Sequence, residues 1–358
     1  MKTATENSEK TILDVCRLAS DLLGIAVHSA QRIGGSGNNR VYSLEYGNSR
    51  KGVAKFYFCH PADKRDRLHA EFSSLSFLWE QGMADIPQPI AVNREESCAI
   101  YGFIEGKKIT PADTTNEDIV RAVDFLGRLK NLNHLAARSQ NMPAASDACF
   151  SIQAILANVE GRLNRFQGLE HDEPEYCELG SFLQDDFKPF LSVLAKWARE
   201  QCAQSGISFD REISQEQKTL SPSDFGFHNA LRAPDGRIVF LDFEYFGWDD
   251  PAKTVVDFLF HPAMGLSEPM KRNFVQGMLA AFRENEQLLE RVRIVYPLFG
   301  MKWCMIFLNE FVPNDFSRRA FAAANPLDRS RLRTEQLRKA VNLCRKFKET
   351  YEDFSYAA

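Results

Sequence analysis

Three polar side chains are closely spaced in residues 220–257, which read LSPSDFGFHNALRAPDGRIVFLDFEYFGWDDPAKTVVD. Asp224 and Asn229 lie five residues apart in a predicted loop, and Asp242 ends a short apolar run. A carboxylate in a loop can accept or orient a hydroxyl proton. An amide oxygen and a second carboxylate are hard oxygen ligands of the kind that Mg²⁺ prefers. The spacing therefore predicts a centre that handles a hydroxyl group and a magnesium ion.

The order of these motifs resembles the aminoglycoside phosphotransferase and choline kinase family: D-x-x-x-x-N, a DGR turn, an apolar run ending in D-F-E, and then D-D-P. The resemblance implies a protein-kinase-like fold, with ATP and Mg²⁺ as cofactors. It implies transfer of the γ-phosphoryl group to a hydroxyl of a small molecule, such as a sugar, amino sugar, aminoglycoside or amino alcohol. By position, it implies Asp224 as the catalytic base and Asn229 and Asp242 as magnesium ligands.

One position departs from the family pattern, because Pro222 stands where the family has a histidine two residues before the catalytic aspartate. That histidine is mainly architectural, and we expect His228 to be a structural histidine that takes over part of its packing. The departure keeps open a second hypothesis, a weakly active or inactive nucleotide-binding scaffold on the same fold. A protein kinase is disfavoured, because the short segment from Asp242 to Pro251 leaves little room for a peptide platform.

A glycine-rich segment nearer the N-terminus, IGGSGNNRVY, resembles the nucleotide loop of the same family. Its candidate nucleotide-binding residues are Gly34, Gly35, Ser36, Gly37 and Asn39. Glycine permits positive φ and a close approach of backbone to phosphate. Taken alone, the segment is equally compatible with a plain hairpin turn. It is not a Walker loop, since no G-K-[ST] follows.

Lys55 lies between apolar neighbours in a predicted strand, where a lysine is either exposed at an edge or buried with a partner. The resemblance pairs it with the α- and β-phosphates of ATP and with a glutamate of the next helix. Glu71, sixteen residues further on, is the better centred candidate, with Glu80 as the fallback. The resemblance also implies that backbone groups near Tyr101 and Phe103 bind the adenine edge.

Hydrophobic periodicity predicts a small β-rich lobe over residues 1–105. Helices are expected over residues 11–24 and about 62–81. Strands are expected over residues 41–46, 52–58 and 97–103, with a turn at 47–51. Residues 86–92 contain two prolines, which favours an edge strand or an extended loop.

Helices dominate the predicted second lobe, residues 106–358. They are expected over residues 116–137, 150–168, 181–203 and from 252 onward, with an acidic loop over 168–180 and a strand over 236–244. Asp250 before Pro251 is expected to cap a helix. The fold class is thus α+β and protein-kinase-like, with a small β-rich N-lobe and a larger, mainly helical C-lobe.

The segments that would select the acceptor give opposite signals. By resemblance they are a helical insert, about residues 150–215, and the C-terminal helices. The acidic loop could attract a cationic amine, whereas the basic stretch 318–348 could face an anionic substrate. A solvated loop is the favoured interpretation of the acidic segment, and the basic stretch could equally be a solvated helix face. The aromatic run from Tyr245 to Trp248 is a candidate wall of the acceptor pocket.

Composition narrows the classes of partner. The chain has 358 residues, a formal charge of −4 and a pI of about 6.0, so a basic footprint for nucleic acid is missing. We find neither a secretory signal nor an apolar stretch of the ~18 residues that a membrane span needs. We therefore expect a cytoplasmic protein, either monomer or homodimer, with no membrane partner. The eight scattered cysteines are expected to be ordinary thiols.

Overall fold

The computed structural model describes residues 10–33, 39–59, 65–139, 142–169, 173–312 and 329–356. The described chain forms two compact units. The first consists of residues 10–109 and 227–246, and the second consists of residues 110–226, 247–312 and 329–356. The predicted division of the chain at residue 105 stays a prediction, and residues 227–246 cluster with the first unit. Among the helices in the described ranges, none combines the length and apolar character that crossing a bilayer requires.

The first unit is built on an antiparallel sheet of five strands in the order β1-β2-β3-β5-β4. The strands are β1 (Val27–Ile33), β2 (Asn39–Tyr46), β3 (Arg50–Tyr57), β4 (Pro89–Asn93) and β5 (Cys98–Gly102). The predicted β2–β3 hairpin is confirmed. So is the edge position of β4, where the missing N–H of Pro89 costs nothing. Strand β1 was not predicted, because most of its side chains are exposed or half-buried and give no apolar alternation.

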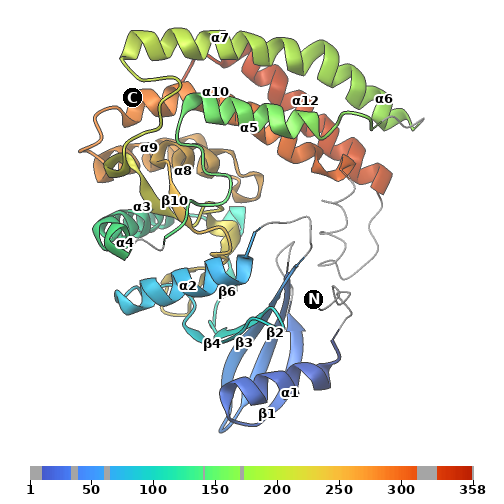
Figure 1. Ribbon diagram of the computed structural model, residues 1–358, viewed down its shortest axis with the longest axis vertical. Coiled ribbons are helices and arrows are strands. Elements are labelled where there is room, and N and C mark those ends of the chain that lie inside the picture. Colours follow the sequence, from blue (N-terminus) through green and yellow to red (C-terminus); the bar gives the residue numbers. More distant parts are fainter. Residues whose placement is uncertain are drawn as a thin grey trace. The chain divides into compact units, whose positions relative to one another are not determined.

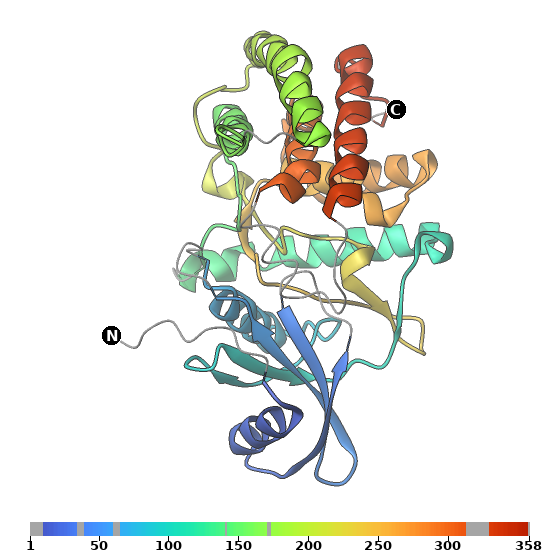
Figure 2. The ribbon, with the colours of Figure 1, turned by 90° about the vertical axis from the view of Figure 1, so that its right-hand side faces the viewer.

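Two helices cover opposite faces of this sheet (Figures 1 and 2). Helix α1 (Ile12–Leu23) begins at a Thr11 capping box and ends at Gly24, and it packs against the sheet through Val15 and Ala19. Successive strand residues point to opposite faces. In β3, Ala54 and Phe56 therefore join the α1 core, whereas the intervening residues face helix α2 (Arg67–Glu80).

Residues 227–246 add a second, three-stranded sheet to the first unit. It contains β6 (Lys107–Lys108), β8 (Ala230–Arg232) and β9 (Ile238–Phe240), in the order β6-β8-β9. The turn between β8 and β9 holds Gly236 at φ 85°, a value that glycine adopts without strain. The backbone N–H of Phe240 donates to the Asp85 carbonyl at 3.0 Å, which joins the hairpin to the rest of the unit.

The second unit is mainly helical (Figure 1). Its helices are α3 (Asn116–Asn131), α4 (Asn133–Ser139), α5 (Ile152–Asn164), α6 (Pro174–Ser181), α7 (Lys188–Ser205), α8 (Pro251–Phe260), α9 (Glu268–Ala281), α10 (Leu288–Phe307) and α12 (Arg329–Thr350). Two short strands, β7 (Thr219–Ser221) and β10 (Gly247–Asp249), pair with each other. Helix α10 is almost entirely buried and contacts α5, α7, α8 and α12.

One predicted loop is a helix instead. Residues 168–180 were expected to be an acidic loop, but α6 begins at Pro174 and continues through a π-helical turn (Phe182–Phe187) into α7. Proline and acidic side chains favour the first turn of a helix as much as they favour a loop. Pro174 and Glu175 therefore mark a helix start. The predicted cap at Asp250 is confirmed, since its side chain accepts from the Ala252 N–H at 2.8 Å.

The contact between α10 and α12 tolerates no side chain at Gly300. A Cβ atom there would overlap the ring of Phe347, which is fully buried against Phe260 and Tyr296 and has no room to move. Gly300 is therefore required for close packing of the two helices rather than for an unusual backbone conformation.

We expect Gly300→Ala to lower the free energy of unfolding of the second unit by about 1–3 kcal/mol, as overpacked cores do. Gly161→Ala in α5 is the matched control, because open space surrounds that glycine. The control should be neutral or up to about 1 kcal/mol more stable, since alanine is the better helix former. Urea unfolding of both variants measures the difference, and equal effects would contradict the packing argument.

Candidate active site

A buried ion-pair cluster in the first unit joins three elements. The Lys55 ammonium on β3 donates to Glu71 Oε2 of α2 at 2.6 Å and to Asp242 Oδ1 after β9 at 2.7 Å. Tyr57 donates its hydroxyl to the same Glu71 oxygen at 2.8 Å. The predicted pairing of Lys55 with Glu71, rather than with Glu80, is confirmed. The structure also brings Asp242 to the same ammonium.

Burial and charge act against each other in this cluster. Burial alone would lower the pKa of Lys55, but the carboxylates of Asp242 and Glu71 outweigh it and raise that pKa well above its usual range. Burial raises the pKa of Asp242 to about 7, with a further contribution from Glu244 and Glu71, although the Lys55 ammonium opposes the shift. Lys55 is thus held as a cation, and Asp242 needs more positive charge nearby to be fully ionised.

Glu244 and Arg67 are also buried and extend the cluster. Sequence reasoning identified neither of them as part of the site. Glu244 accepts from the Asn39 side-chain amide at 2.6 Å and lies 3.6 Å from Arg67 Nε. Carboxylate oxygens of Glu71, Asp242 and Glu244 lie within 4.8 Å of one another. Lys55 thus binds two of these three carboxylates, and Arg67 lies beside the third.

Asn229 and Asp242 lie at the same end of the β8–β9 hairpin. Asn229 immediately precedes β8, and its carbonyl accepts from the N–H of Leu241, the residue before Asp242. Asp242 adopts φ 65°, a left-handed conformation that is rare for a non-glycine residue and is concentrated at functional sites. A carboxylate and an amide at the open end of one hairpin, beside two further carboxylates, fit a divalent cation with hard oxygen ligands.

The structure says less about the other residues that were predicted to bind the nucleotide. Gly34, Gly35, Ser36 and Gly37 lie outside the described residues. Asn39 begins β2, and its amide binds Glu244.

Tyr101 lies in β5 with its hydroxyl 2.7 Å from that of Tyr57, and Lys51 stacks over the Phe103 ring. Contact of these residues with a nucleotide stays a prediction.

Phe246 and Trp248, two of the candidates for the wall of the acceptor pocket, are buried. Their side chains are 2% and 9% exposed and pack in the interior of their respective units.

In the second unit, a buried lysine fixes the backbone beside Asp224. Ser223 adopts φ 67°, and its hydroxyl donates to the Ser146 carbonyl at 3.0 Å. The Lys253 ammonium, 1% exposed, donates to the Ser223 hydroxyl at 2.9 Å and to Asp249 Oδ2 at 2.7 Å. Asp249 and Asp257 raise the pKa of Lys253 despite its burial, which keeps it charged. Lys253 therefore holds the segment that presents Asp224.

The same lysine reaches Asp224 by a second route. Its ammonium lies 3.3 Å from Asp257, which accepts from the indole N–H of Trp303 at 3.0 Å. The Trp303 ring meets the His261 ring edge to face at 5.3 Å, and His261 Nε2 lies 4.0 Å from Asp224 Oδ1. These contacts form a closed circuit around Asp224, whose side chain is 42% exposed.

The circuit explains how the loop is organised with Pro222 in place of a histidine. Ser221 accepts from the Ser223 N–H at 3.0 Å, and the Thr254 hydroxyl lies 3.2 Å from the Ser221 hydroxyl. Sequence reasoning missed Lys253. The available signal was its position four residues after one aspartate and four before another, which places all three on one helix face.

We expect Lys253→Met to lower the free energy of unfolding of the second unit by about 3–5 kcal/mol, because it leaves Asp249 buried without its cation. Adding Asp249→Leu should restore most of the loss, since an apolar pair removes the uncompensated charge. Urea unfolding followed by tryptophan fluorescence measures both variants. A double variant no more stable than the single one would show that the ion pair is not the source of the effect.

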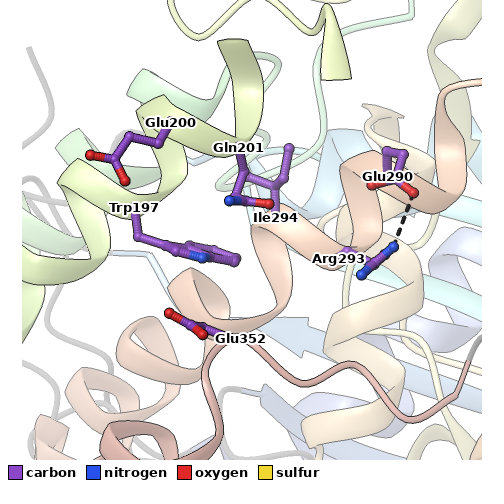
Figure 3. A pocket seen from close by; sticks show the side chains of 7 residues that line it. All are labelled: Trp197, Glu200, Gln201, Glu290, Arg293, Ile294 and Glu352. Carbon is purple, nitrogen blue, oxygen red and sulfur yellow. Dashed lines mark hydrogen bonds and ion pairs between the residues drawn. The ribbon is translucent and has the colours of Figure 1, made fainter. Parts of the chain in front are cut away.

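A pocket of about 270 Å³ also lies in the second unit, between α7, α10 and the segment after α12 (Figure 3). Its lining residues are Trp197, Glu200, Gln201, Glu290, Arg293, Ile294 and Glu352. Glu290 and Arg293, three residues apart on α10, form an ion pair at one side of the pocket at 3.2 Å. None of the predicted site residues lines it, so it is separate from the candidate active site.

Comparison with known proteins identifies the family of the chain. The model of the phosphotransferase enzyme family matches residues 29–294, and the chain belongs to this family. The match extends from β1 to the first turns of α10 and so spans both units. No curated protein matches the chain.

Solved structures share the fold. Spectinomycin phosphotransferase APH(9)-Ia, crystallised with ADP and spectinomycin, has a TM-score of 0.60 at 13% identity, covering 96% of this chain and 100% of its own. The choline kinase LicA from Streptococcus pneumoniae has a TM-score of 0.58 at 14% identity, covering 93% and 98%. An ethanolamine kinase from Plasmodium vivax has a TM-score of 0.56 at 15% identity, covering 90% and 83%. The kinase-like fold predicted from the sequence is confirmed.

Proposed function

We propose that this phosphotransferase uses ATP and Mg²⁺ to phosphorylate a hydroxyl group of a small molecule. The observation that carries the proposal is the buried Lys55–Glu71–Asp242 cluster, which holds one cation and one carboxylate in fixed positions. Structural neighbours crystallised with ADP and AMP support a nucleotide as the phosphoryl donor. A cytoplasmic location belongs to the same proposal, because the reaction draws on ATP.

Each residue has a separate role in the proposed reaction. Lys55, oriented by Glu71, binds the non-transferred phosphates, and Asp242 and Asn229 hold Mg²⁺. The bound metal would neutralise charge that develops on the phosphoryl oxygens. Asp224 orients the acceptor hydroxyl and takes its proton as the oxygen bonds to the γ-phosphorus. The bond from that phosphorus to the β-phosphate oxygen breaks, and ADP leaves.

Such a reaction relies on positioning and electrostatics more than on covalent chemistry. The structure supports this through buried lysines that fix the Asp242 turn and the Ser223 turn. These intact contacts also favour an active enzyme over an inactive scaffold, because the loop that carries Pro222 has a full set of alternative anchors.

We expect Asp224→Asn to lower acceptor-dependent ADP release about 10²- to 10⁴-fold while Mg²⁺-dependent ATP binding persists. Asp242→Asn should abolish both, since it removes a metal ligand. Asp235→Asn is the control, because that carboxylate pairs with Arg237 in the exposed turn of the same hairpin. An ADP-release screen against sugars, sugar acids, amino sugars, aminoglycosides and choline-like amines provides the assay. Unchanged turnover in Asp224→Asn would exclude Asp224 as the base.

We expect Lys55→Met to raise the KM for ATP and to destabilise the first unit by about 3–5 kcal/mol, because Glu71 and Asp242 lose their shared cation. Lys107→Met is the matched control, since Lys107 is an exposed lysine on strand β6 of the same unit. ATP titrations and thermal unfolding test both variants. Equal behaviour of the two lysines would contradict a special role for Lys55.

A further inference from the structure

Lys302 differs from the other deeply buried lysines of this chain. It lies on α10 with 4% exposure, comparable to Lys55 at 7% and Lys253 at 1%. Those two lysines donate to carboxylates at 2.6–2.7 Å. Over the described ranges, by contrast, no acceptor receives a hydrogen bond from Lys302. Its ammonium contacts only the face of the Phe299 ring, 4.9 Å from the centroid.

Two carboxylates that act on the same thiol as Lys302 already have other partners. Burial raises the pKa of Cys149 to about 11, and the charges of Lys302 and Lys253 oppose that shift, so both ammonium groups lie near this thiol. Asp147 and Asp249 act on the same thiol in the opposite direction. Asp147 pairs with Arg162, however, and Asp249 pairs with Lys253. The local negative charges are thus neutralised without Lys302.

An ammonium group taken out of water loses several kcal/mol of solvation unless an anion or hydrogen-bond acceptors replace it. A single aromatic face at this distance recovers about 0.5–2 kcal/mol. Among the described residues, Lys302 therefore lacks the electrostatic compensation by carboxylates that Lys55 and Lys253 have. A ligand that supplies negative charge would provide it.

A short series of contacts connects the helix position next to Lys302 with the predicted catalytic base. It is the neighbour of Trp303 on α10, Trp303 contacts His261, and His261 lies 4.0 Å from Asp224. Two side chains therefore link the position of Lys302 to Asp224. An acceptor that binds both residues would offer a hydroxyl to Asp224 at one end and a charged group to Lys302 at the other.

We propose that Lys302 binds an anionic group, a carboxylate or a phosphate, of the acceptor molecule. The inference rests on the proposed function, and it narrows the acceptor to a hydroxy acid, a sugar acid or a sugar phosphate. Aminoglycosides and choline-like amines are disfavoured, because their positive charge would be repelled by an uncompensated ammonium. The spectinomycin and choline kinases share the fold, and their acceptors do not transfer to this chain.

Thermal unfolding tests the site without any turnover. The probes are inorganic phosphate and D-glycerate, each compared with sodium chloride at equal ionic strength. The variants are Lys302→Met, Lys302→Arg and the control Lys196→Met, which removes an exposed lysine of α7. Without a probe, Lys302→Met should be at least as stable as the wild type, because it removes an uncompensated buried charge.

At ten times the dissociation constant, phosphate or glycerate should raise the unfolding midpoint of the wild type by roughly 3 °C. The same shift should persist in Lys196→Met, persist in part in Lys302→Arg and vanish in Lys302→Met. The probe that gives the shift identifies the anionic group. A wild type that responds to neither anion would overturn the proposal, as would an undiminished response in Lys302→Met. A probe-free midpoint several degrees lower in Lys302→Met would assign the lysine a purely structural role.

Turnover provides the second readout. With the acceptor found by ADP release, Lys302→Met should raise the KM about 10- to 100-fold, as expected for loss of a hydrogen bond to a charged group, and should change kcat little. A neutral or cationic preferred acceptor would overturn the proposal. Absence of turnover with every acceptor would count against the proposed function alone, because the anion-dependent midpoint does not depend on phosphoryl transfer.

Discussion

The first unit depends on one buried ammonium group, that of Lys55. Strand β3 supplies the cation, α2 supplies Glu71, and the hairpin of residues 227–246 supplies Asp242. The three elements are distant in the sequence, and each brings a charge that would be costly to bury alone. Their mutual compensation therefore determines how the helix and the hairpin pack on the sheet. It also places a cation and a carboxylate where phosphoryl transfer would need them.

The same physical solution recurs in the second unit with different residues. Lys253 is buried against Asp249 and Asp257 and also donates to Ser223. In both units the lysine holds a turn in which a non-glycine residue has a positive φ, Asp242 in one and Ser223 in the other. Such backbone strain persists only where the surroundings over-determine it. A fully paired buried lysine supplies that determination, because the ammonium can donate to several fixed acceptors at once.

Local patterns predicted the parts of the site that lie on regular elements. Aromatic and β-branched residues located β3, an apolar run located β9, and helical spacing located α2. The family resemblance then selected Lys55, Glu71 and Asp242 on or beside these elements. The sequence did not reveal Glu244 or Lys253 as site residues, because their partners come from other elements and no local pattern records such contacts. Strand β1 was not predicted for a related reason. Pairing with β2, rather than an apolar face, holds it in the sheet.

Burial alone does not distinguish a structural lysine from a ligand-binding one, but the acceptors around it do. Lys55 and Lys253 each donate to carboxylates, and replacing either one leaves charge uncompensated in the folded chain. Among the residues that the structure describes, Lys302 contacts an aromatic face and no carboxylate, so these residues give little electrostatic energy in return for its charge. A methionine would fill the same space at lower cost. The charge is therefore explained by what binds to it, and the acceptor is the molecule in the proposed reaction that can bring an anion to this part of the second unit.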